Sequence, residues 1–337
     1  MQDEEQDLPA KAANTFSKET IQSRKIRGNA ILSNMRAILR DIPLGRRRTQ
    51  IGLILRQLWY VNGCFFNIEV WNGFSSNDLK DWKLIDRKIL RLITGAQSKV
   101  PIEMLYLETA QLPVENMISV RKLLYLKTIL DRHESELIRQ VYCAMKEDPV
   151  KGDWIHLVKK DMREINLNMS DEDIMKTPAS IFKQLIKKKV RELVFNELEA
   201  VKSNHSKVKH IVHKGMKHPQ GYLVSGELSN SQCKLLFNLR SKCVNEFKSN
   251  FYPSICMFCK SSPDTQEHAV ECHSLKKHLR KETHELLTTV TYNNIFSDTV
   301  DQLQITKVYQ DIIRTRERIR ASTLDPAHPG KNTGPGG

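Results

Sequence analysis

Three cysteines and one histidine in the C-terminal third of the chain have the spacing of metal ligands. The pattern is Cys-x2-Cys-x8-His-x3-Cys, formed by Cys256, Cys259, His268 and Cys272. A tight turn lets the first two sulfurs face one point, and residues four apart on a helix share a face. Three thiolates and one imidazole make the closed tetrahedral donor set of a structural zinc site. We therefore expect structural zinc; the alternatives are chance spacing and His273 as a rival ligand, which its adjacency to Cys272 disfavours.

The other residues capable of chemistry do not form a catalytic pattern. Polymerases and nucleases that use two metal ions need converging carboxylates, and the chain contains no Asp-Asp dipeptide. The dense acidic cluster Asp171–Asp173 follows Ser170 and suits a helix N-terminus, where negative charge is favoured. Phosphate-binding glycine loops, dinucleotide fingerprints and His-Glu-x-x-His do not occur in the sequence. We therefore expect no catalytic residue and no enzymatic activity from this chain alone.

Positive charge is concentrated in two segments. The chain has 53 lysines and arginines against 39 aspartates and glutamates, a net charge of +14. Residues 24–56 hold nine basic side chains and one acidic one, and residues 181–220 hold ten basic and three acidic ones. Such clusters indicate a polyanionic partner such as RNA or DNA, and the alternative is a solvated helix face. The predicted nucleic-acid contacts are Arg24, Lys25, Arg27, Arg46, Arg47, Arg48, Lys187, Lys188 and Lys189.

The elements that carry these residues are predicted to be almost entirely helical. Apolar residues recur at helical spacing, Pro43 and Gly45 interrupt the pattern, and residues 204–227 suit a loop or a short hairpin. No apolar run reaches the roughly 18–20 residues of a membrane helix, and the acidic start lacks a secretory signal. We therefore expect no membrane partner and a location in the nucleus or cytoplasm. The main expected helices lie at about 19–41, 75–95, 113–130, 134–147, 153–165, 178–203, 229–241, 274–290 and 301–320.

This order of elements predicts a mainly α protein with several parts. The terminal segments lack an apolar pattern, so we expect disorder there. The predicted parts are a disordered tail at 1–18, a helical bundle at 19–150, a basic helical linker at 151–245, a zinc-binding region at 246–290, a C-terminal helical segment at 291–321 and a disordered tail at 322–337.

Four phrases and the cysteine segment together resemble a known family. The phrases are Asp41-Ile-Pro-Leu-Gly-Arg46, Asn67-Ile-Glu-Val-Trp71, Ile85-Asp-Arg-Lys-Ile-Leu-Arg-Leu-Ile-Thr-Gly95 and Lys99-Val-Pro-Ile-Glu-Met-Leu-Tyr-Leu-Glu108. In this order, with Thr265-Gln266-Glu267-His268 leading into the last ligands, they are similar to the C-terminal region of non-LTR (LINE-type) retrotransposon reverse transcriptases. The resemblance covers about residues 20–285.

The resemblance implies a helical thumb that holds a template–primer duplex, a linker, and a CCHC zinc knuckle that engages RNA or target DNA during target-primed reverse transcription. It implies the same four zinc ligands, with Arg46, Arg47 and Arg48 near the duplex-facing helices. The family's palm with its paired aspartates and its endonuclease have no counterpart here, so the resemblance is to a C-terminal piece. Many family members separate the last two ligands by four residues, whereas this chain separates them by three.

Three interpretations follow from these residues. The first is a non-catalytic, nucleic-acid-binding fragment, which accounts for both basic segments. The second is a zinc-stabilised protein-interaction module, which leaves the basic segments unexplained. The third is a non-functional remnant of a retrotransposon. The sequence does not decide between RNA and DNA, and it leaves the oligomeric state open.

Overall fold

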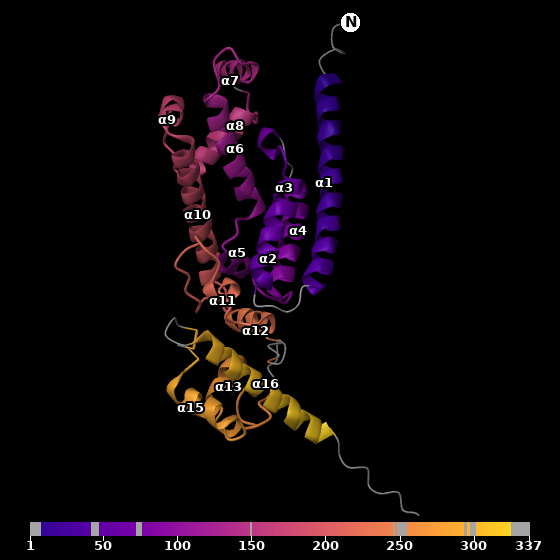
Figure 1. Ribbon diagram of the computed structural model, residues 1–337, viewed down its shortest axis with the longest axis vertical. Helices are drawn as coiled ribbons and strands as arrows, with labels where there is room; N and C mark the ends of the chain where they lie inside the picture. The colour runs from indigo at the N-terminus through magenta and orange to yellow at the C-terminus, as the bar shows by residue number, and fades with distance from the viewer. Residues whose placement is uncertain are drawn as a thin grey trace, which may run out of the picture. The chain divides into compact units, whose positions relative to one another are not determined.

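The computed structural model of this chain describes residues 8–41, 47–71, 76–148, 150–244, 247, 255–292, 295–296 and 301–324. The chain divides into two compact units, Met1–Phe237 and Asn238–Gly337 (Figure 1). Within the described residues there is no β-strand, and Ile255 and Pro263 form an isolated antiparallel bridge. The predicted mainly α fold class is therefore confirmed. None of the described helices combines the length and the apolar composition needed to cross a membrane.

The first unit is a set of helices joined by loops (Figure 1). Its longer helices are α1 (Leu8–Asp41), α2 (Arg48–Leu55), α4 (Ser76–Thr94), α5 (Ile102–Thr109), α6 (Val114–Leu130), α7 (Leu137–Glu147), α8 (Trp154–Glu164) and α10 (Ala179–Ser203). Its shorter elements are the π-helix η1 (Arg56–Val61), α3 (Asn62–Cys64), the 3-10 helix η2 (Ile68–Val70), α9 (Asp171–Lys176) and α11 (Gly221–Val224). Helix α12 (Asn230–Arg240) crosses the boundary between the two units.

Aromatic and branched side chains form the core of the first unit. Phe65 packs edge-to-face against both Tyr60 and Trp82, with ring centroids 5.3 and 5.4 Å apart. On α4 the buried residues Trp82, Ile85 and Ile89 recur every three or four positions, which is the spacing of one helix face. This face explains why α4 packs against α1 and α2. Helix α10 packs separately, against α5 and α6.

The second unit is held together by a buried ion pair as well as by apolar packing. Its helices are α13 (Gln266–Glu271), α14 (His273–Lys276), α15 (Lys281–Thr289) and α16 (Gln302–Leu324). Arg316 of α16 donates to the Asp264 carboxylate at 2.6 Å and bonds its second oxygen as well. The same guanidinium lies 4.7 Å from the ring centroid of Phe247. These contacts fix α16 against the segment that leads into α13.

The terminal helices extend beyond their predicted ends. Helix α1 begins at Leu8, inside the segment 1–18 expected to be disordered. Pro9 suits a first helical turn, and the alanines that follow have the highest helix propensity. Helix α16 continues through Leu324, into the segment 322–337 that was also expected to be disordered. The remaining parts of both tails lie outside the described residues, as do the predicted break at Pro43 and Gly45 and the predicted helix start at residue 75.

The first compact unit, which ends at Phe237, extends across the predicted boundary between a bundle at 19–150 and a linker at 151–245. Helix α10 buries Phe182, Ile186 and Val190, and it packs against α5 and α6. Its apolar face therefore places most of the predicted linker within the first unit, which ends at Phe237. The segment 204–227 contains turns and the short helix α11, so the hairpin alternative is wrong and the loop alternative is confirmed.

Candidate metal centre and nucleic-acid interface

The predicted metal ligands come from a tight turn and a short helix in the second unit. The amide of Cys256 donates to Ser262 O at 2.8 Å, and the amide of Lys260 donates to Cys256 O at 2.9 Å. Lys260 adopts a left-handed conformation, φ 54°, which reverses the chain after the first two cysteines. Helix α13 then begins at a side-chain cap, in which the hydroxyl of Thr265 accepts from the amide of His268 at 3.1 Å.

The structure brings the four predicted ligands together. One ligand atom from each of Cys256, Cys259, His268 and Cys272 lies within 4.8 Å of the others. The Sγ atoms of Cys256 and Cys272 are 3.8 Å apart, and Cys259 Sγ is 3.2 Å from His268 Nε2. Helix α13 ends at Glu271, so Cys272 stands at the start of α14 rather than on the helix of His268. The rival His273 is exposed and is not part of the cluster.

Cys259 and Cys272 of this Cys3His cluster have different surroundings, which shift their pKa values in opposite directions. Hydrogen bonds from the side chain and backbone of Ser261 lower the pKa of Cys259 to about 5. Burial raises the pKa of Cys272 to about 11, although its sulfur accepts from the Leu275 amide at 3.4 Å. A bound cation favours the thiolate form of every cysteine ligand. The donor set fits a metal ion with four protein ligands, which leaves no open position for chemistry.

A groove lined by cations lies between α6 and α10 in the first unit. It has a volume of about 350 Å³, and α10 contributes Lys183, Lys187 and Arg191 to its wall. These three residues are spaced by four, so they form one stripe along the helix. Across the groove, α6 contributes Arg121 together with apolar side chains such as Met117. We call this feature the α6–α10 groove.

The cations of the α10 stripe have no carboxylate partners within the described part of the chain, in contrast to other cations nearby. Arg121 donates to Phe65 O at 2.8 Å and lies 3.9 Å from Glu69. Burial lowers the pKa of Lys187, and the like charges of Lys183 and Arg191 lower it further. The Nε of Arg191 is buried and has no hydrogen-bond partner among the residues that the structure describes. Like charges at this spacing repel one another, so the stripe is suited to an external anion.

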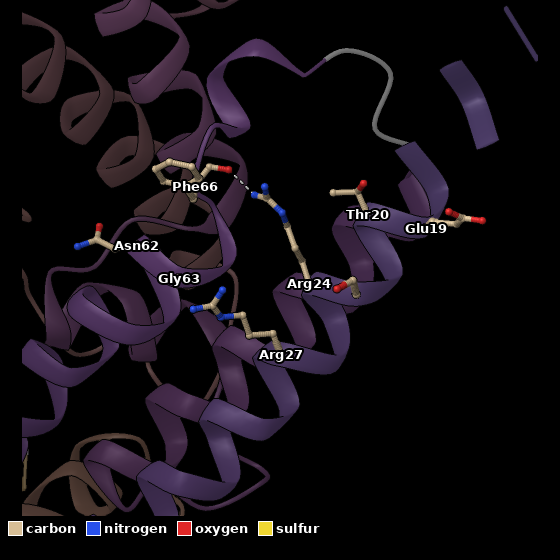
Figure 2. Close-up of a pocket in the computed structure, with 8 residues that line it drawn as sticks. Glu19, Thr20, Arg24, Arg27, Asn62, Gly63 and Phe66 are labelled. Atoms are coloured by element: carbon tan, nitrogen blue, oxygen red, sulfur yellow. Dashed lines mark hydrogen bonds between the residues drawn. The ribbon is translucent and has the colours of Figure 1, made fainter. Parts of the chain in front are cut away.

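The predicted contacts of the first basic segment do not form one surface in the described structure. Arg24 reaches from α1 to the carbonyl of Phe66 (Figure 2). It also donates to the carbonyl of Cys64 at 3.0 Å, and its guanidinium stacks over Trp71. Lys25 forms ion pairs with Asp78 and Asp81 at 3.2 and 3.0 Å. Arg27 is exposed and lines the pocket drawn in Figure 2.

The remaining predicted contacts are also divided. Arg46 lies outside the described residues, Arg47 is exposed, and Arg48 donates to Leu39 O at 2.8 Å. On α10, Lys188 pairs with Glu192 at 3.9 Å, and Lys189 donates to Asn166 O at 3.0 Å. Of the eight predicted residues that the structure describes, Lys187 is therefore the one that lines the α6–α10 groove. Sequence reasoning missed Lys183, Arg191 and Arg121, although the spacing of four between the α10 cations was visible.

Comparison with known proteins adds no relative. No protein-family model, no curated protein and no solved structure matches this chain. The interpretation of both sites therefore rests on their residues and geometry.

Proposed function

We propose that this chain is a non-catalytic nucleic-acid-binding protein that holds the phosphate backbone in the α6–α10 groove. The observation that carries the proposal is the stripe of Lys183, Lys187 and Arg191, which line one groove without carboxylate partners in the described part. A polyanion that neutralises such a stripe releases its condensed counterions, which drives binding. The resemblance to the C-terminal region of non-LTR reverse transcriptases supports the same function and suggests RNA or a template–primer duplex as ligand.

We propose further that the Cys3His cluster holds a structural zinc ion. Zinc prefers thiolate and imidazole ligands in a tetrahedral arrangement, and four such donors lie within 4.8 Å of one another. Cys256, Cys259, His268 and Cys272 would bind it, and the ion would tie the turn at 256–260 to the start of α14. Small zinc-binding units of this kind bind nucleic acid in other proteins, so a zinc ion here is compatible with nucleic acid as the ligand.

The test is fluorescence anisotropy of a labelled primer–template duplex and of a structured RNA at several salt concentrations. The logarithm of the affinity should fall linearly with the logarithm of the salt concentration. A Lys183→Ala/Lys187→Ala variant should reduce the steepness of this slope by about two for the duplex, since each phosphate contact contributes about 0.9. The matched control is Lys159→Ala/Lys160→Ala, which removes the same charge from α8 and should leave the slope unchanged. A flat salt response, or equal losses in both variants, would refute the proposal.

A second candidate function, protein interaction, is favoured by one specific observation. Helix α7 directs its apolar side chains outwards, with Leu137 75% exposed and Val141 47% exposed, whereas Arg139 and Tyr142 are buried. Such an apolar face is a feature of protein-binding helices. The simplest partner is a second copy of the chain. Sedimentation velocity of the wild type and of Leu137→Asp tests it, because self-association through α7 should disappear in the variant.

A further inference from the structure

A second pocket adjoins the α10 stripe and differs from the first in its lining. It lies between α10 and residues 214–217, and its volume is about 630 Å³, within the range of about 300–1,000 Å³ of ligand pockets. Lys187 and Arg191 line both this pocket and the α6–α10 groove. Its apolar lining comes from the half-buried ring of Phe195 and from Met216, which is buried. We call it the 214–217 pocket.

The wall of the 214–217 pocket is anchored on both sides by buried polar contacts. Immediately before it, the two ring nitrogens of His213 each lie 2.9 Å from a carboxylate, that of Glu108 and that of Glu199. Just after it, the amide of Gln220 donates to Glu108 O at 2.8 Å, and Tyr222 donates to the Glu108 carboxylate at 2.7 Å. The wall is therefore fixed to α5 and α10, and the pocket is formed before any ligand arrives.

The rim of this pocket is strongly basic. Among the described residues, five cationic side chains and one acidic residue, Glu192, line it. The cations are Lys187, Lys188, Arg191, Lys214 and Lys217, of which Lys188 pairs with Glu192 at 3.9 Å. A ligand that complements the pocket must therefore combine an apolar, flat or compact body with negative charge on both sides of it. A nucleotide within a single strand has this composition, because each base is flanked by two phosphates.

We infer that the 214–217 pocket receives one unstacked base of a single-stranded nucleic acid, with the flanking phosphates on the lysine and arginine rim. This inference rests on the proposed function and specifies its ligand. Proteins that bind single strands combine a basic groove with aromatic side chains on which bases stack. A base within a duplex is paired and stacked, so it can enter a protein pocket only after it leaves the nucleic-acid helix. The Phe195 ring therefore selects single strands, whereas the α6–α10 groove needs only phosphates.

The experiment compares two short single-stranded oligonucleotides that carry the same number of phosphates. One contains normal bases and the other contains abasic tetrahydrofuran units, and both are titrated with the full chain by fluorescence anisotropy at fixed salt. We expect the base-containing strand to bind about ten-fold more tightly, which is the usual contribution of one stacked base. Phe195→Leu keeps apolar volume but removes the ring, so it should bring the two affinities close together. Phe195→Tyr retains a ring and should preserve the preference.

The outcomes separate this inference from the proposed function. Equal, salt-dependent affinities of the wild type for both strands would overturn the inference and leave the proposed function intact. Binding to neither strand nor to the duplex at low salt would overturn the proposed function itself. Polyglutamate that competes as effectively as the base-containing strand would also overturn the inference, because the pocket would then recognise an acidic peptide. The wild-type comparison needs no variant, so it holds even if Phe195→Leu destabilises the fold.

Discussion

The ion pair between Arg56 and Asp86 should be one of the most costly contacts to break in the first unit. Arg56 is 1% exposed and Asp86 is fully buried, and the Arg56 Nε donates to the carboxylate at 2.8 Å. Tyr106 donates to the other carboxylate oxygen at 3.1 Å, and a second guanidinium nitrogen donates to Gln111 at 2.8 Å. Burial acts to lower the pKa of Arg56, but Asp86 outweighs this effect and the pKa is raised. Arg56 is therefore a cation in the folded protein.

Removal of one partner leaves the other charge buried without its counterion, which costs about 3–5 kcal/mol. Arg56→Met and Asp86→Leu should each lower the free energy of unfolding by this amount, and the melting temperature by about 10 °C for a unit of this size. The double variant Arg56→Met/Asp86→Leu should be clearly less destabilised than the sum of the two, because no isolated charge is left.

Urea unfolding followed by tryptophan fluorescence measures these costs. All four tryptophans lie before residue 155 and therefore report on the first unit alone. A single variant that costs less than about 1 kcal/mol, or additive costs in the double variant, would refute the reasoning about burial. Arg56 also lines the α6–α10 groove, yet its donors are already engaged. Arg56→Met should therefore leave the salt slope of nucleic-acid binding unchanged, which contrasts with the expected loss in Lys183→Ala/Lys187→Ala.

Two further predictions concern the metal ligands and a helix cap. Native mass spectrometry should detect one zinc ion per chain. Chelation or Cys259→Ser should remove the ion and reduce the helical circular dichroism signal without altering tryptophan fluorescence. An unchanged circular dichroism spectrum after metal loss would contradict a structural role. Hydrogen bonds from Ser170 lower the pKa of Asp173 in a capping box, so its stabilisation is complete above the ordinary carboxyl pKa and is lost as the pH falls through the lowered value. The urea midpoint of unfolding should therefore be higher for the wild type than for Asp173→Asn at neutral pH, and the two midpoints should be equal in strong acid. A difference in midpoint that persists in acid would contradict the role of the Asp173 carboxylate.

The features that sequence reasoning predicted well depend on residues close together in the chain. The regular apolar spacing after Pro178 predicts a helix at 178–203, and α10 occurs at Ala179–Ser203. The Cys3His cluster spans 17 residues, from Cys256 to Cys272, so its turn and its spacing were readable directly. Local spacing determines such features, and no distant partner is needed to recognise them.

The features that sequence reasoning missed depend on distant partners. Arg56 belongs to the first basic segment, but its counterion Asp86 follows 30 residues later on α4. Lys25 likewise meets Asp78, 53 residues away. The anchor of the 214–217 pocket joins His213 to Glu108, separated by 105 residues. No local pattern indicates such pairs, because they exist only once the helices have packed.

The number of cations in a segment is therefore a weaker guide to an anion site than their period along a helix. Lys187, Lys188 and Lys189 are adjacent in sequence, but successive residues of a helix point about 100° apart. Lys188 finds Glu192 four residues on, and Lys189 reaches a backbone carbonyl, so neither is as available as Lys187. Lys183, Lys187 and Arg191 share one face instead, and their mutual repulsion opposes helix stability at every step. The stripe costs stability, and two of its members, Lys187 and Arg191, line both pockets. A ligand that neutralises the stripe best explains it, and the period of four, rather than the contiguous run of lysines, identifies the stripe in the sequence.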